Sequence, residues 1–195
     1  MSKNIKIQEG LKTKKDILKK ARRLFTKGYE NISTPELAEN IGLTRGAIYH
    51  HFKNKKHLFE SVVIEIAKEI TSSINDVAET QVDAVESIVS GSLEFIRYCQ
   101  KKDVRKIYLE EAPAILGWKR WREIDEEHSL GSLIEGIKHC YNQGLISKEQ
   151  IIPIAYLISG SLNEAVFLTS EKQLNNLERT ALEKGIIKNI KSLLT

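Results

Sequence analysis

Apolar residues recur along almost the whole chain with the three- and four-residue spacing of one helix face. The first segment with this pattern opens at the capping-box pair Thr13 and Asp16 and ends at Gly28. Short apolar runs elsewhere lack the two-residue alternation and the turn residues that mark strands and hairpins. The pattern therefore predicts an all-α protein of about nine helices.

A pair of short helices joined by a tight turn is predicted in the stretch that opens at Ser33. Ser33 and Glu36 have capping-box spacing, and Pro35 suits a first helical turn. Gly42 can adopt the left-handed conformation that ends a helix, and Thr44 can cap the next one. This arrangement is a helix-turn-helix, a motif that places its second helix in the major groove of DNA.

The net charge of +4 is unevenly distributed along the chain. Residues 1–60 contain 14 Lys or Arg and 6 Asp or Glu, whereas residues 61–195 contain 16 and 20. Cations are thus concentrated on the part that carries the helix-turn-helix, which favours binding to a phosphate backbone. A lysine-rich solvated surface is the alternative interpretation.

Other functional classes find little support in the residues. The cysteines, Cys99 and Cys140, lie far apart and are interpreted as buried free thiols of a cytoplasmic protein. No uninterrupted run of about 18 apolar residues and no apolar leader is present, so we expect neither a membrane partner nor secretion. Zinc-protease, nucleophile-elbow and phosphate-loop motifs are missing, so we expect no enzymatic activity, no cofactor and no metal site.

Residues 37–59, LAENIGLTRGAIYHHFKNKKHLF, follow a helix that ends at Gly28-Tyr29, and this block resembles the TetR family of bacterial transcriptional regulators. The resemblance implies a helix-turn-helix DNA-binding domain over residues 1–54 and a helical effector-binding and dimerisation domain over residues 55–195. It also implies a homodimeric, ligand-responsive regulator, most often a repressor that a small molecule releases from a palindromic double-stranded DNA operator. The alternative is a sequence-specific DNA-binding regulator or organiser without a small-molecule effector.

The candidate DNA contacts divide into those that position the protein and those that read bases. Ser33 and Thr34 lie at a helix N-terminus, where backbone N–H groups favour a phosphate. Tyr49 can hydrogen-bond to the DNA backbone, and Lys55 adds a cation at the start of the fourth helix. These positions match phosphate contacts of the family, and Lys53 is an addition to them.

Base reading is assigned to the start of the second helix of the motif. Arg45 can form a bidentate bond to guanine, which contributes about 1–3 kcal/mol of discrimination. Thr44 and His50 are the next candidates, and Gly46 lets the backbone approach the DNA. Ala47 either contacts a thymine methyl group or faces the core.

Aromatic residues on the later helices are candidates for lining an effector pocket, together with one amide. As a set they could surround a largely apolar small molecule, although plain core packing is the alternative for each ring. Glu110 and Glu111 could select a cation, with a solvated face as the alternative. The predicted ligand-binding residues are Phe95, Tyr98, Tyr108, Trp118, Trp121, Tyr156, Asn163 and Phe167.

Apolar stripes on the last pair of predicted helices need a cover, which an isologous helical bundle between two copies would supply. Packing within one chain is the alternative. The predicted dimer-interface residues are Ile154, Ile158, Ser161, Ala165 and Leu168 on the first of these helices, and Ile186, Ile190 and Leu193 on the second.

Overall fold

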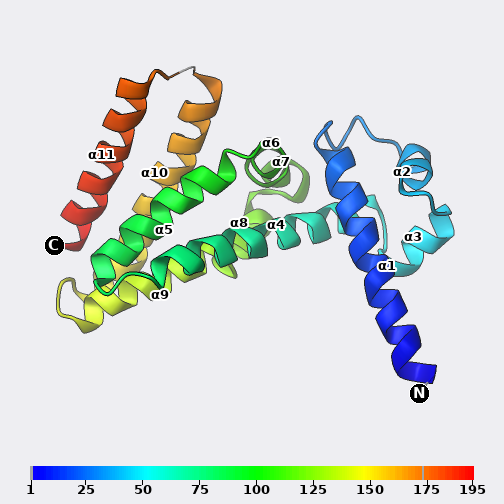
Figure 1. The fold of residues 1–195 in the computed structure, drawn as a ribbon, viewed down its shortest axis with the longest axis horizontal. Coiled ribbons are helices and arrows are strands. Elements are labelled where there is room, and N and C mark those ends of the chain that lie inside the picture. Colours follow the sequence, from blue (N-terminus) through cyan, green and yellow to red (C-terminus); the bar gives the residue numbers. More distant parts are fainter. Residues whose placement is uncertain (1, 173) are drawn as a thin grey trace. The chain divides into compact units, whose positions relative to one another are not determined.

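The computed structural model describes residues 2–172 and 174–195, and every regular element among them is helical. The all-α prediction is therefore confirmed (Figure 1). The chain divides into two compact units. Unit 1 comprises residues 1–66 and 106–121, and unit 2 comprises residues 67–105 and 122–195.

Unit 1 contains the N-terminal helices and a later segment of the chain. Its elements are α1 (Ser2–Phe25), α2 (Thr34–Ile41), α3 (Arg45–His51), the first half of α4 (Lys55–Ala78), nearly all of a π-helix η1 (Arg105–Glu111), α7 (Ala112–Leu116) and the start of α8 (Trp118–Glu126). Helix α2 packs against α1 and α3, and each of the three helices contributes buried apolar side chains, among them Ile17, Leu37 and Ile48. This is the three-helix arrangement that the N-terminal pattern predicts.

Helix α1 begins earlier than the sequence pattern predicted. The capping-box pair at Thr13 was expected to start it, but the helix runs from Ser2, and the Thr13 hydroxyl donates to the Glu9 carbonyl at 2.9 Å. A hydroxyl bonded to the carbonyl four residues earlier belongs to a helix interior, not to an N-cap. Gly10 lies within the helix and does not end it, since an interior glycine costs only about 1 kcal/mol relative to alanine.

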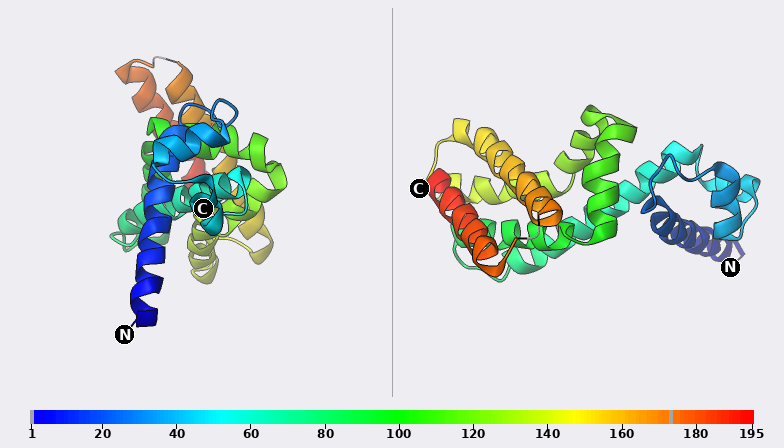
Figure 2. Two further views of the ribbon diagram at one scale, coloured as in Figure 1. Left: turned by 90° about the vertical axis from the view of Figure 1, so that its right-hand side faces the viewer. Right: turned by 90° about the horizontal axis from the view of Figure 1, so that it is seen from above.

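Unit 2 is a bundle built around α10. Its elements are the second half of α4, α5 (Ala84–Cys99), α6 (Lys102–Val104), the rest of α8, α9 (Ser129–Asn142), a short 3₁₀ helix η2 (Lys148–Gln150), α10 (Ile151–Glu171) and α11 (Asn176–Leu194). Helix α10 packs against α5, α9 and α11, as Figures 1 and 2 show from three sides. Cys99 and Cys140 are buried free thiols within this unit, as expected.

The apolar spacing over residues 118–144 predicts one long helix, but the structure divides this stretch into α8 and α9. A Cβ atom on Gly131 would lie 2.3 Å from the Glu126 carbonyl oxygen, so the backbone makes a close approach at this junction that only glycine allows. A proline in a helical pattern predicts a disrupted helix end, but Pro113 lies in the first turn of α7, where a missing N–H is tolerated.

The segment Lys148–Ser170, which includes most of α10, is long and apolar enough to cross a membrane by composition alone, with a mean hydropathy of 1.6. The sequence contains no uninterrupted apolar run of that length, but the mean hydropathy of this segment, taken over its apolar and polar residues together, is high enough. The packing of α10 against α5, α9 and α11 supplies another cause for its apolar character, because a central helix of a bundle is covered on several sides.

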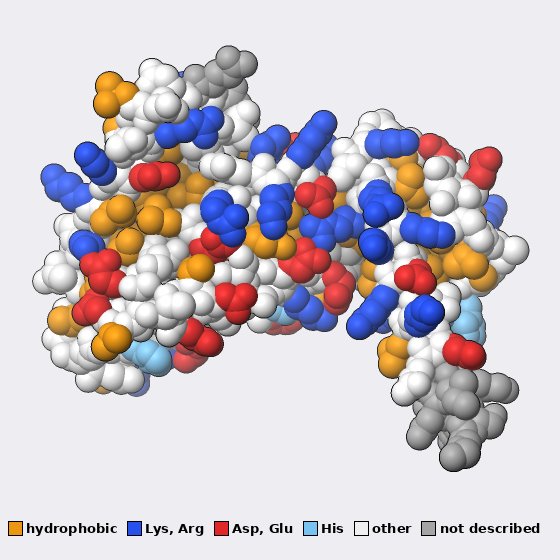
Figure 3. Space-filling view, in the orientation of Figure 1, with side chains coloured by type: hydrophobic (Ala, Val, Ile, Leu, Met, Phe, Trp, Pro, Cys, Tyr) orange, Lys and Arg blue, Asp and Glu red, His pale blue; other side chains and the backbone are white. Residues whose placement is uncertain are grey.

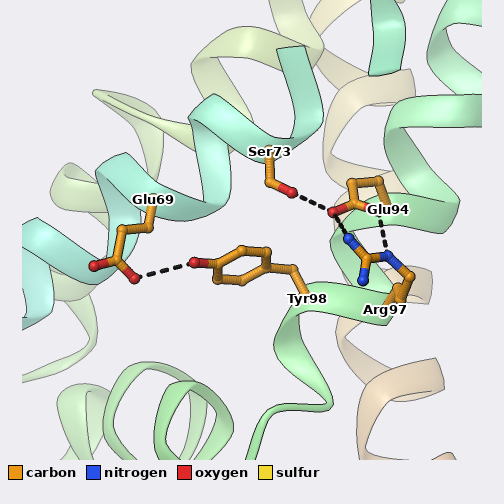
Figure 4. Close-up of polar contacts among 5 residues, drawn as sticks. All are labelled: Glu69, Ser73, Glu94, Arg97 and Tyr98. Atoms are coloured by element: carbon orange, nitrogen blue, oxygen red, sulfur yellow. Dashed lines mark hydrogen bonds and ion pairs between the residues drawn. The ribbon is translucent and has the colours of Figure 1, made fainter. Parts of the chain in front are cut away.

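A polar cluster joins α4 to α5 within unit 2 (Figure 4). The buried Glu94 carboxylate accepts hydrogen bonds from Ser73 on α4 and from Arg97 Nε, the latter at 2.6 Å. One turn further along α5, the Tyr98 hydroxyl donates to Glu69 at 3.1 Å. These bonds fix the register of the two helices that form part of the cavity described below.

Candidate functional site

Local caps hold α2 and α3 in the geometry that the sequence predicted. The Ser33 hydroxyl oxygen accepts from the Glu36 N–H at 3.3 Å, and the Thr44 hydroxyl oxygen accepts from the Ala47 N–H at 3.1 Å. Between them Gly42 has a φ of 75°, the left-handed conformation that favours glycine. The turn of the helix-turn-helix is therefore specified by interactions that span only a few residues.

The first turn of α3 presents its side chains and backbone to solvent. Arg45, Gly46 and His50 are exposed, and Ala47 is half-buried. The opposite face is anchored by Ile48 and by Phe52 just after the helix, and each is only 1% exposed. A rigid helix with a buried back and an exposed N-terminal end is the geometry required to insert into a major groove.

The residues expected to position the DNA backbone lie near the start of α2 and the end of α3. The Tyr49 hydroxyl lies 3.3 Å from the Thr34 hydroxyl and donates to it, so these two candidates are adjacent in space. Ser33 and Lys53 are exposed. On the face drawn in Figure 3, Lys and Arg side chains are frequent over the helices of unit 1.

Lys55 has a role that the sequence did not reveal. Its ammonium donates to the Tyr29 carbonyl at 2.6 Å and lies 3.9 Å from the centre of the Tyr29 ring. Burial lowers the pKa of Lys55 below its usual value, while the carboxylates of Glu30 and Glu111 act in the opposite direction. Lys55 thus joins the start of α4 to the chain just after α1. An ammonium has three donors, so a phosphate contact requires one of those that remain.

Glu111 is the main residue of unit 1 that sequence reasoning misjudged. Its Oε2 atom accepts from the Tyr29 N–H at 2.6 Å, and its Oε1 atom lies 3.5 Å from the Lys106 ammonium. The carboxylate therefore neither selects a cation from solvent nor lies on a solvated face. It holds the backbone after Gly28, and no local pattern could have indicated this partner, 82 residues away in sequence.

Among the predicted ligand-binding residues, three belong to unit 1. Tyr108 and Trp121 are buried, with ring centroids 5.9 Å apart, and the Trp118 ring lies 4.9 Å from that of Trp121. Trp118 is 62% exposed. Tyr108 and Trp121 therefore pack as part of the core of unit 1, as the alternative interpretation of these rings anticipated.

A cavity of about 80 Å³ lies within unit 2, between α4, α5, α8, α9 and α10. Phe95 is the predicted ligand-binding residue found in its wall. Tyr98 instead bonds to Glu69, and Tyr156 is exposed, with its hydroxyl on Glu126 and the Arg122 guanidinium 5.3 Å from its ring centre.

Asn163 and Phe167 are half-buried on α10 but are not part of the cavity wall. That helix contributes Ser159 and Leu162 to the wall instead. Successive helical residues point about 100° apart, so Asn163 points away from the direction of Leu162. Of the five predicted ligand-binding residues in unit 2, the structure therefore places Phe95 in the wall of this cavity and the other four outside it.

Most of the predicted dimer stripe lies in the chain's own core. The buried members are Ile154, Ile158, Ala165, Ile186 and Ile190, and the half-buried ones are Ser161, Leu168 and Leu193. Packing within one chain, the alternative interpretation, accounts for the buried five. Larger apolar side chains that remain exposed on α10 are Ile152, Tyr156 and Leu157, and α11 exposes Leu177.

Comparisons with known proteins find matches to two parts of the chain. Residues 17–62 match the family model described as "Bacterial regulatory proteins, tetR family", and residues 85–193 match "Tetracyclin repressor-like, C-terminal domain". The Transposon Tn10 TetC protein of Escherichia coli is 29% identical over 184 residues, which cover 91% of this chain and 88% of that protein.

Two further similarities extend this result. A solved structure of a TetR-family transcriptional regulator from Pectobacterium atrosepticum has a TM-score of 0.72 and 28% identity, covering 96% of this chain and 94% of that one. The HTH-type transcriptional repressor AcnR of Corynebacterium diphtheriae is 44% identical over 55 residues, which are 28% of this chain and 29% of that protein.

Proposed function

Since this chain belongs to the TetR family of bacterial regulatory proteins, we propose that it is a cytoplasmic repressor that a small molecule releases from a palindromic operator. DNA binding is assigned to α2 and α3 in unit 1, and effector binding to the cavity of unit 2. The observation that carries the DNA-binding assignment is the exposed first turn of α3, held by a capped N-terminus and a buried rear face.

On α3, base reading is assigned to the residues that are exposed to solvent and not buried in unit 1. Arg45 and His50 are exposed at the start and toward the end of α3, and Gly46 leaves the backbone accessible. Thr44 contributes mainly through its cap, because its hydroxyl oxygen already accepts the Ala47 N–H. Arg45 is therefore the first candidate for direct base reading.

A homodimer is supported by the exposed apolar residues of α10. Ile152 and Leu157 are 51% and 59% exposed, and Tyr156 lies beside them on the same helix. A two-fold related copy would cover this surface, and two reading helices would then meet two half-sites of a palindrome. The interface face proposed here is shifted around α10 from the stripe that the sequence predicted, because most of that stripe is already buried.

The test is a gel-shift and fluorescence-anisotropy measurement on duplex DNA from the promoter region upstream of the protein's own gene, across a range of salt concentrations. We expect a discrete complex whose footprint has two-fold symmetry and whose affinity falls as salt rises. Equal affinity for every duplex tested, with no protected site, would contradict sequence-specific regulation and favour an organiser of DNA.

A further inference from the structure

We propose that the cavity of unit 2 binds the hydroxyl end of a small neutral alcohol, with Ser92 as a hydrogen-bond partner. The inference rests on the proposed function only in treating this molecule as the effector. The binding site itself is argued from the cavity.

Ser92 is the residue that indicates a ligand. It lies on α5 in the cavity wall and is 4% exposed. Within the part of the chain that the structure describes, its hydroxyl oxygen has no hydrogen-bond partner. Buried hydroxyl groups in folded proteins nearly always have a partner, and leaving one unpaired destabilises the fold. A hydroxyl in the cavity would supply the missing bond, since a serine hydroxyl can both donate and accept.

Apolar side chains form most of the remaining wall, including Ile74, Ile88, Leu133 and Leu162. A Cβ atom on Gly91 would lie 3.0 Å from Ile74 Cγ2, so glycine at this position lets α5 approach α4 closely beside the cavity. The wall therefore offers hydrocarbon to most of an occupant and hydrogen bonds at a few points, which is typical of small-molecule sites.

The charge state of the wall favours a neutral occupant. Asp125 is the charged residue among the described residues of the wall, and it is 4% exposed. Its Oδ2 atom lies 2.7 Å from Arg122 Nη1, and its Oδ1 atom accepts from the Ser129 hydroxyl at 2.6 Å. An anion would be repelled by this carboxylate, and a cation would have to compete with Arg122 and lose its own hydration.

An alcohol suits this wall better than a carbonyl compound. A carboxylate has about four lone-pair sites and only accepts hydrogen bonds, so Asp125 favours an occupant that carries a donor. A hydroxyl can accept from Ser92 and also donate to a neighbouring oxygen, whereas a ketone can only accept. The volume of about 80 Å³ limits the occupant's size. A cavity of about 150 Å³ holds benzene, so about three or four non-hydrogen atoms fit inside this one.

The test uses the full chain and four probes with the same number of non-hydrogen atoms, within the limit that the cavity volume sets: 1-propanol, acetone, acetate and propylammonium. Binding is measured by titration with ligand-observed saturation-transfer NMR, and the melting temperature of each variant is recorded beforehand. We expect saturable binding of 1-propanol, weaker binding of acetone, and no binding of acetate or propylammonium.

The Ser92→Ala variant should bind 1-propanol about two- to tenfold more weakly, which is the range expected for losing one hydrogen bond. It should melt no lower than the parent protein, because it loses an unpaired hydroxyl. The matched control is Ser90→Ala, which lies two residues earlier on α5 outside the cavity wall and should leave the affinity unchanged.

Several results would overturn the proposal: no saturable binding of 1-propanol, tighter binding of either ion, equal affinity for acetone, or an unchanged affinity for 1-propanol in Ser92→Ala. DNA binding is measured separately without any probe. A protein that binds its operator but not 1-propanol would refute this inference alone, whereas one that binds 1-propanol but no DNA would refute the proposed function.

Discussion

Replacing Glu111 with alanine should weaken unit 1, because this carboxylate accepts the backbone N–H of Tyr29 at 2.6 Å. Hydrogen bonds to charged groups contribute about 1.5–3 kcal/mol, and removing the acceptor leaves that N–H without its partner. The Glu111 side chain is 16% exposed, so solvent replaces the lost bond only in part. We therefore expect Glu111→Ala to lower the free energy of unfolding by about 2 kcal/mol.

The matched control is the neighbouring residue. Glu110 pairs with Lys106 at 3.2 Å, but its side chain is 33% exposed, and such surface ion pairs contribute at most about 1 kcal/mol. Both variants are compared with the parent protein by urea-induced unfolding, followed by circular dichroism. A third variant, Glu111→Gln, keeps an acceptor oxygen and should lie between the parent and Glu111→Ala.

The same substitution should also affect DNA binding, since Glu111 holds the chain immediately after α1. We expect Glu111→Ala to reduce operator affinity without changing which bases are preferred, because no reading residue is altered. Two results would contradict this role of the Glu111 carboxylate. One is equal destabilisation by Glu110→Ala and Glu111→Ala, and the other is a Glu111→Ala variant that unfolds at the same urea concentration as the parent protein.

Three further predictions follow from the described contacts. Arg45→Ala should weaken operator binding by about 1–3 kcal/mol and relax preference at one base position, and an unchanged footprint would argue against it. Leu157→Glu should convert a dimer into a monomer in light scattering, whereas Leu177→Glu on α11 serves as an exposed apolar comparison. Burial raises the pKa of the Glu94 carboxyl, but its hydrogen bonds, first of all the one from Arg97, lower the pKa by more. The pKa of Glu94 therefore lies below its usual value. At acid pH the unfolded state then binds more protons than the folded state. The stabilisation is therefore present above the ordinary glutamate pKa and is lost as the pH falls through the lowered pKa of Glu94. Glu94→Gln should make the free energy of unfolding depend less on pH in this acid range.

The helix-turn-helix could be predicted in detail because its determinants are local. The Ser33 and Thr44 caps each bond to a backbone N–H three residues away, and Gly42 determines the turn through its own φ angle. Interactions of this range are visible in a single sequence. The same local signal was misleading at Thr13, where capping-box spacing occurs inside a continuous helix.

The apolar stripes illustrate a different limit. Their period correctly indicated that one face of α10 is covered, but period alone cannot distinguish cover by the same chain from cover by a second copy. The structure buries Ile154 and Ile158 within the chain and leaves Ile152 and Leu157 exposed. The aromatic residues pose the same problem, since a ring in the core and a ring in a pocket have the same spacing.

The sequence by itself determined the helical class, the turn of the DNA-binding motif and the family, because each depends on residues within a few positions of one another. Only the tertiary structure decided that Glu111 holds the backbone at Tyr29, and that the buried Ser92 hydroxyl has no partner among the described residues and shares a cavity wall with Asp125, which pairs with Arg122. Those facts depend on contacts between helices distant in sequence. Their energies come from burial and hydrogen bonding in three dimensions, which leave no period or motif in the chain.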